Sequence, residues 1–121
     1  MSDRINVSSG SSFEDAVGYS RAVRVGPHVV VAGTTGSGED AAAQTRDALR
    51  RIAVALNDVG AELGHVVRTR MYVTDISRWR EVAAVHAEVF GDIRPVATMV
   101  EVSALIAPDL KVEIEADAYL P

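Results

Sequence analysis

The chain has 121 residues, of which 48% are apolar and 24% charged. Its 12 Lys and Arg against 17 Asp and Glu give a formal net charge of −5. This balance argues against a basic nucleic-acid-binding module, because no excess of positive charge is available to meet phosphates. The apolar content excludes intrinsic disorder, and the length indicates one domain spanning residues 1–121.

Cysteine is absent, which excludes disulfides, thiolate zinc sites, iron–sulfur clusters and cysteine nucleophiles. The three histidines, His28, His65 and His86, lack the spacing of paired metal ligands, so we expect no metal and no other cofactor. No apolar stretch approaches the roughly 18 residues of a membrane span. The first residues lack the basic and apolar regions of a signal peptide. We therefore expect a soluble, cytoplasmic protein without a membrane partner.

The N-terminal third predicts a loop and then a hairpin. Residues 8–12, Ser-Ser-Gly-Ser-Ser, are interpreted as a loop. Segments 20–25 and 28–32 flank the turn signal Gly26-Pro27, and the second segment is a β-branched run typical of a buried strand. The glycine-rich segment 33–38 lacks the Lys-Ser/Thr ending of a phosphate loop, so it is interpreted as a connection.

The middle of the chain predicts two helices around one strand. Apolar residues at helical spacing predict a helix over 39–59, with Glu39 and Asp40 in its first turn and Gly60 at its end. A strand is expected over 66–75. A second helix is expected over 77–90, with an apolar stripe formed by Trp79, Val82, Ala83, His86, Val89 and Phe90. Trp79 and Phe90 are expected in the core or an interface, and His86 is expected to be packed and hydrogen-bonded rather than catalytic.

Two strands are expected at the C-terminus, over 96–105 and 110–119. The last strand alternates, with Val112, Ile114, Ala116 and Ala118 on one face and Lys111, Glu113, Glu115 and Asp117 on the other. Three carboxylates on one face repel one another unless they are solvated or paired. Two interpretations stay open: a solvated or edge face of the sheet, or a pocket in which one Glu accepts and donates protons. Arg68 and Arg70 can pair with this row if the two strands are neighbours.

The predicted order is strand–strand–helix–strand–helix–strand–strand. It indicates an α+β fold, with two helices on one face of a mixed sheet. The other face is left without helices although nearly half of the residues are apolar, so we expect a homo-oligomer that covers it.

Two further polar positions are candidates for a site. Tyr19 and Arg21 share one face of an extended segment, and together they offer a phenol and a guanidinium to an anionic small molecule. The alternative is an exposed Arg beside a partly packed Tyr. Glu101 lies in an apolar strand, so we expect it on a solvated face or bound to an Arg or to backbone amides.

The C-terminal segments 94–102, Arg-Pro-Val-Ala-Thr-Met-Val-Glu-Val, and 111–116, Lys-Val-Glu-Ile-Glu-Ala, resemble the signature of the RidA family, also called YjgF or L-PSP endoribonuclease-like. Segments 17–20, 29–34 and 70–76 agree with it. The resemblance implies a chorismate-mutase-like α+β fold in a homotrimer, whose sheets form a central barrel with helices outside and pockets between subunits. It also implies deaminase activity, the hydrolytic release of ammonia from reactive enamines and imines such as 2-aminoacrylate.

By this resemblance, the water-orienting Glu of the family falls on Glu113 and its Tyr on Tyr19. The family's substrate-binding Arg falls on Ala97, which argues against 2-aminoacrylate itself, and Arg21 is the first candidate to replace that cation. The implied small-molecule pocket comprises Tyr19, Arg21, Ala32, Gly33, Ala97, Thr98, Met99, Glu101 and Glu113. The alternatives are a non-catalytic metabolite-binding or regulatory trimer and, opposed by the negative charge, a ribonuclease.

Overall fold

A computed structural model describes residues 4–121. Its strands are β1 (Arg4–Val7), β2 (Ala22–Val25), β3 (His28–Thr34), β4 (Val66–Val73), β5 (Val96–Glu101) and β6 (Val112–Tyr119). Its α-helices are α1 (Ser12–Val17), α2 (Ala41–Asp58) and α3 (Trp79–Phe90). Two short 3-10 helices, η1 (Leu63–His65) and η2 (Ile76–Arg78), precede β4 and α3.

The strands of residues 4–121 form one sheet of six in the order β1-β2-β3-β6-β4-β5. β4 and β5 run parallel and the other neighbours run antiparallel, so the sheet is mixed. β2 and β3 form the expected hairpin around Gly26-Pro27, where Val25 pairs with His28. The predicted α+β fold is confirmed. Because β6 lies between β3 and β4, the last strand is central to the sheet.

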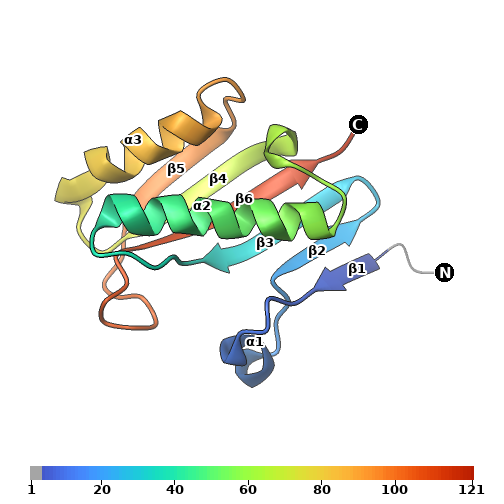
Figure 1. The fold of residues 1–121 in the computed structure, drawn as a ribbon, viewed down its shortest axis with the longest axis horizontal. Helices are drawn as coiled ribbons and strands as arrows, with labels where there is room; N and C mark the ends of the chain where they lie inside the picture. Colours follow the sequence, from blue (N-terminus) through green and yellow to red (C-terminus); the bar gives the residue numbers. More distant parts are fainter. Residues whose placement is uncertain (1–3) are drawn as a thin grey trace.

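The hydrophobic core lies between the sheet and the helices α2 and α3, which lie side by side over one face (Figure 1). The predicted buried face of β6 is confirmed, since Val112, Ile114, Ala116 and Ala118 are each at most 1% exposed. They pack in one cluster with apolar residues of both helices, including Leu49, Ile52, Leu56, Val82 and Phe90. Among the described residues, no helix is long and apolar enough to cross a membrane.

The opposite face of the sheet carries exposed apolar side chains between its charged ones. Val30 on β3 and Val96 and Val100 on β5 are each more than 40% exposed. Within residues 4–121 no helix lies over this face (Figure 1). We call it the open face.

The N-terminal region differs from its prediction. β1 and α1 were not expected, and Ser12 belongs to α1 rather than to the predicted loop. Ser11 caps α1 by accepting a hydrogen bond from the amide of Phe13, and Gly18 ends the helix in the left-handed region. These two signals are present in the sequence, but six residues are too few for a helical period to be recognised.

Most of the other predicted elements were one to four residues too long at an end, whereas the strand expected over 28–32 continues to Thr34. α2 begins at Ala41 because the Asp40 side chain is its N-cap and accepts from the amide of Ala43. The strand expected over 96–105 ends at Glu101, and the strand expected over 66–75 ends at Val73. Trp79 is 43% exposed and stacks against Arg80, so it does not lie in the core of the chain, and its alternative place in an interface stays a prediction. Phe90 is buried as expected.

Candidate active site

The carboxylates of β6 lie on the open face and differ in their partners. β4 is the neighbour of β6, with Arg70 opposite Glu115. Arg70 lies 3.5 Å from Asp117 and 4.0 Å from Glu115, so its predicted pairing with this row is confirmed. The Tyr72 hydroxyl donates to Glu115 at 2.7 Å, and this bond raises the pKa of Tyr72. Two members of the row therefore have partners on β4.

Glu113 is the member of the row without such a partner. Its half-buried carboxylate accepts no hydrogen bond from residues 4–121. Burial raises the pKa of Glu113, the negative charge of Glu115 raises it further, and the charge of Arg21 opposes the rise. Gly33 lies so close that a Cβ at this position would overlap the Glu113 carboxylate. Glu113 is thus a desolvated and comparatively strong base.

Arg21 and Tyr19 lie beside this carboxylate. One terminal nitrogen of Arg21 donates to the Gly33 carbonyl at 2.8 Å and to the Thr34 hydroxyl at 3.2 Å. The other donates to the Tyr19 hydroxyl at 3.2 Å. Tyr19 therefore uses its oxygen as an acceptor and keeps its own proton available for a ligand.

A buried carboxylate holds Arg21 from the other side. Glu14 on α1 is 4% exposed, and its Oε2 lies 3.5 Å from Nε of Arg21. It also accepts from the Ser8 hydroxyl at 2.7 Å and from the amide and hydroxyl of Ser9. Burial alone would raise the pKa of Glu14, but the bonds from Ser9 and Ser8 and the charge of Arg21 outweigh it and lower the pKa. Glu14, Ser8 and Ser9 were not among the predicted site residues.

One wide, open cavity of about 1140 Å³ contacts this constellation. Tyr19, Arg21, Ala32, Gly33 and Glu113 all line it, so five of the predicted site residues share one space. The remaining walls come from α1, α2 and the segment between β5 and β6. A cavity of this size and mixed lining fits a small organic molecule.

The four predicted site residues on β5 lie elsewhere within the chain. β4 separates β5 from β6, so they are two strands away from Glu113. Thr98 pairs with Arg70 and shares the open face, whereas Ala97, Met99 and Glu101 pair with Thr69, Met71 and Val73 on the helix-covered side. Glu101 accepts a hydrogen bond from the amide of Ile76 at 3.0 Å, which confirms the expected backbone partner.

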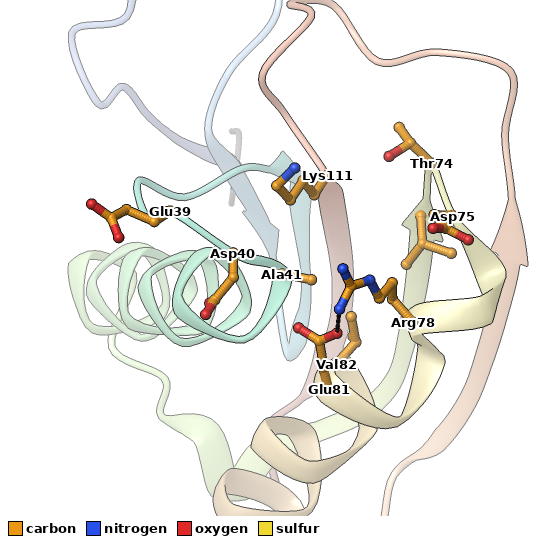
Figure 2. Close-up of a pocket in the computed structure, with 10 residues that line it drawn as sticks. Glu39, Asp40, Ala41, Thr74, Asp75, Arg78, Glu81, Val82 and Lys111 are labelled. Carbon is orange, nitrogen blue, oxygen red and sulfur yellow. Dashed lines mark hydrogen bonds and ion pairs between the residues drawn. The ribbon is translucent and has the colours of Figure 1, made fainter.

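A second, smaller cavity of about 250 Å³ lies where α2 and α3 begin (Figure 2). Arg78 and Glu81 form an ion pair at 2.8 Å there, and Asp75 caps the turn at Ser77. It shares no lining residue with the larger cavity. Several of its charged groups thus stabilise the first turns of η2 and α3. The predicted catalytic residues Glu113 and Tyr19 line the larger cavity.

His86 does not contact the larger cavity. Its Nε2 lies 2.9 Å from the Thr69 hydroxyl, and its ring lies 4.7 Å from that of Phe90. Burial lowers the pKa of His86. The predicted packed and hydrogen-bonded His86 is confirmed.

The fold and the cavity define a small α+β protein with a candidate small-molecule site built around an unpaired carboxylate. The family model for Endoribonuclease L-PSP matches residues 9–120. The chain therefore belongs to this family, which is the RidA or YjgF family that the sequence resembles.

Several proteins are similar to the chain over most of its length. The structure of Rv2704 from Mycobacterium tuberculosis, a member of the YjgF/YER057c/UK114 family, is 76% identical with a TM-score of 0.96, and the match covers 97% of this chain and 99% of that one. The 2-iminobutanoate/2-iminopropanoate deaminase of Salmonella typhimurium is 31% identical over 83% of this chain and 85% of that protein. The 3-aminoacrylate deaminase RutC of Acinetobacter baylyi is 35% identical over 67% of this chain and 64% of that protein.

Proposed function

We propose that the protein hydrolyses the C=N bond of a small imine, or of an enamine through its imine tautomer, and releases ammonia. The observation that carries the proposal is Glu113, a carboxylate with a raised pKa and no hydrogen-bond partner in residues 4–121, which faces the large cavity. A base with such an environment is matched to removing a proton from water. The similarity to two proteins named as imine and enamine deaminases supports the same chemistry.

The proposed reaction uses Glu113 and Tyr19 in sequence. Glu113 takes a proton from water while the oxygen attacks the imine carbon, and the Tyr19 hydroxyl donates a hydrogen bond to the imine nitrogen. The resulting carbinolamine carries a new C–O bond. Glu113 returns this proton to nitrogen and then transfers the hydroxyl proton of the carbinolamine to the same nitrogen. The C–N bond breaks as the C=O bond forms, and ammonia leaves together with the carbonyl product.

We further propose that the site is completed in a homotrimer. Within one chain, β4 lies between Glu113 and the predicted residues Ala97, Thr98, Met99 and Glu101. Those residues join Tyr19 and Glu113 in one pocket if β5 of a neighbouring copy lies against the cavity. The exposed Val30, Val96 and Val100 of the open face support an assembly that covers this side of the sheet.

The test measures imine hydrolysis by the wild type and by Glu113→Gln. A primary imine is generated in the assay by an oxidase acting on an amine or an amino acid, and hydrolysis competes with trapping by added semicarbazide. We expect the substitution to reduce the rate by about 100-fold or more, the range typical of a lost general base. Tyr19→Phe is expected to give a smaller loss, because only a hydrogen bond to nitrogen disappears.

Asp117→Asn is the matched control. It makes the same carboxylate-to-amide change on the same strand face, but Asp117 pairs with Arg70. Its activity is expected to stay near wild type. If the folded, oligomeric wild-type protein accelerates the hydrolysis of no imine, the proposed reaction is contradicted and the metabolite-binding alternative is favoured. Equal losses in both variants would contradict the role of Glu113.

A further inference from the structure

The positive charges that one chain contributes to the large cavity are all paired with carboxylates of the same chain. Arg21 is held by Glu14 at 3.5 Å and by three further oxygens. Arg50 and Arg51, which line the cavity from α2, both pair with Asp47, at 2.8 and 3.0 Å. Within residues 4–121, no arginine or lysine lines the cavity without such a partner. A bound carboxylate would therefore have to compete with Glu14 or Asp47 for its cation.

The negative charges of the cavity are only partly matched, since Glu115 has Arg70 and Tyr72 as partners but Glu113 accepts no hydrogen bond from residues 4–121. Its acidic lining residues are Asp58, Asp109, Glu113 and Glu115. The charge of Glu115 contributes to the raised pKa of Glu113. A carboxylate brought by a ligand would add to this repulsion and lose its own hydration. A neutral or protonated imine would avoid both costs, and a protonated imine would be attracted.

Exposed apolar side chains make up much of the remaining wall. They come from three separate elements and are each between 46 and 68% exposed: Phe13, Val17, Val54 and Ile106. Apolar groups exposed together around a cavity favour burial against an apolar ligand. The cavity thus combines apolar walls with a local excess of negative charge.

From this charge arrangement we infer that the substrate is an imine or iminium ion with an apolar substituent and without a carboxylate. The inference rests on the proposed hydrolysis and specifies its substrate class. It assigns Arg21 to holding Tyr19 and the end of β3, and not to binding a substrate anion. For an aldimine the balanced reaction is R–CH=NH plus water to R–CHO plus ammonia, with the proton path through Glu113 given above.

The test uses two imines that differ only by a carboxylate. Phenethylamine and an amine oxidase give the carboxylate-free imine, whereas phenylalanine and an amino-acid oxidase give 2-imino-3-phenylpropanoate. We expect kcat/KM for the carboxylate-free imine to be at least about tenfold higher, which corresponds to about 1.4 kcal/mol. Equal rates, or a faster carboxylated imine, would overturn the inference. If the carboxylated imine is hydrolysed faster and Glu113→Gln abolishes that hydrolysis, the proposed reaction is supported and only the inferred substrate class is wrong.

A charge variant tests the cause. Ile106 is 63% exposed, so Ile106→Lys can add a cation to the cavity with little effect on folding, and Ile106→Met is the control of similar size. We expect Lys, and not Met, to shift the preference toward the carboxylated imine by about tenfold or more. No shift with Lys in a folded protein would overturn the electrostatic reasoning.

A binding measurement tests the inferred ligand preference independently of the proposed hydrolysis. Phenylacetamide and phenylacetate are stable ligands that differ in charge and hardly in shape. Calorimetric titration is expected to give at least about tenfold tighter binding of the amide. Tighter or equal binding of the acid overturns the inference, as does binding of neither at millimolar concentration. A protein that prefers the amide but hydrolyses no imine would refute the hydrolysis and keep the ligand preference.

Discussion

Two carboxylates on either side of Arg21 have opposite environments. Glu14, in the first turn of α1, is almost fully buried, accepts hydrogen bonds from Ser8 and Ser9 of the preceding loop, and has a lowered pKa. Glu113, on the open face of β6, is half-buried, accepts none from residues 4–121, and has a raised pKa. The charge of the same guanidinium favours the ionised form of both, but at Glu113 it only opposes the rise in pKa.

The difference shows that hydrogen bonds, rather than burial alone, decide what a buried carboxylate does. Glu14 loses more water than Glu113 but replaces it with donors, so its charge is stable and serves to hold Arg21. Glu113 loses water without replacement, so its charge is costly and its affinity for a proton is high. The first arrangement favours structure and the second favours proton transfer.

The largest effect is expected from Glu14→Ala. The change leaves the guanidinium of Arg21, whose side chain is 12% exposed, without its carboxylate. Breaking a buried pair in this way costs about 3 kcal/mol. Thermal or denaturant unfolding should show this loss, whereas Glu113→Gln should unfold at the same temperature as wild type or higher. Equal destabilisation by both changes would contradict the contrast.

Gly33→Ala is expected to separate activity from stability. The added Cβ meets the end of the Glu113 side chain, which is flexible and can swing away. We expect imine hydrolysis to fall by about tenfold, a typical result of misplacing a catalytic group, with a much smaller change in stability. Gly64→Ala is the control, because an added Cβ there meets nothing closer than 3.5 Å, and it is expected to leave activity unchanged. Full activity of Gly33→Ala would show that the position of Glu113 does not matter.

The pH dependence of stability should have opposite signs for the two carboxylates. The lowered pKa of Glu14 contributes stability that is present above the ordinary glutamate value and is lost as the pH falls through the folded value. The raised pKa of Glu113 lowers stability as the pH rises from the ordinary value through the raised one. The free energy of unfolding is measured from pH 3 to 8, about the range that spans both groups. In Glu14→Gln it should depend less on pH at the acid end of this range. In Glu113→Gln it should depend less on pH above the ordinary pKa of a glutamate.

The smallest expected effect is a shift in a pH profile. Glu115→Gln removes the like charge that raises the pKa of Glu113, so the acid limb of kcat/KM should move to lower pH by less than about one unit. Asp117→Asn, which does not contribute to that pKa, should leave the limb in place. A shift to higher pH in Glu115→Gln would contradict the assignment of Glu113 as the base.

Much of the fold followed from periodic patterns in the sequence. Alternation on 112–118 and helical spacing on 41–58 set the buried faces of β6 and α2, because burial on one face leaves a period that can be read. The family resemblance of segments 94–102 and 111–116 implied the roles of Glu113 and Tyr19. The short α1 and β1 were missed because they span too few residues for a period.

By itself, the sequence determined the fold class, the family and the carboxylate row of the last strand, since these depend on residue type and local spacing. Only the tertiary structure decided which carboxylate of that row lacks a partner and that Glu14 holds Arg21. Whether a carboxylate of β6 has a partner depends on the strand order, which places β4 on one side of β6 and β3, with Gly33, on the other. Burial of Glu14 depends on α1 closing over Ser8 and Ser9, a contact between side chains that carry no periodic signal.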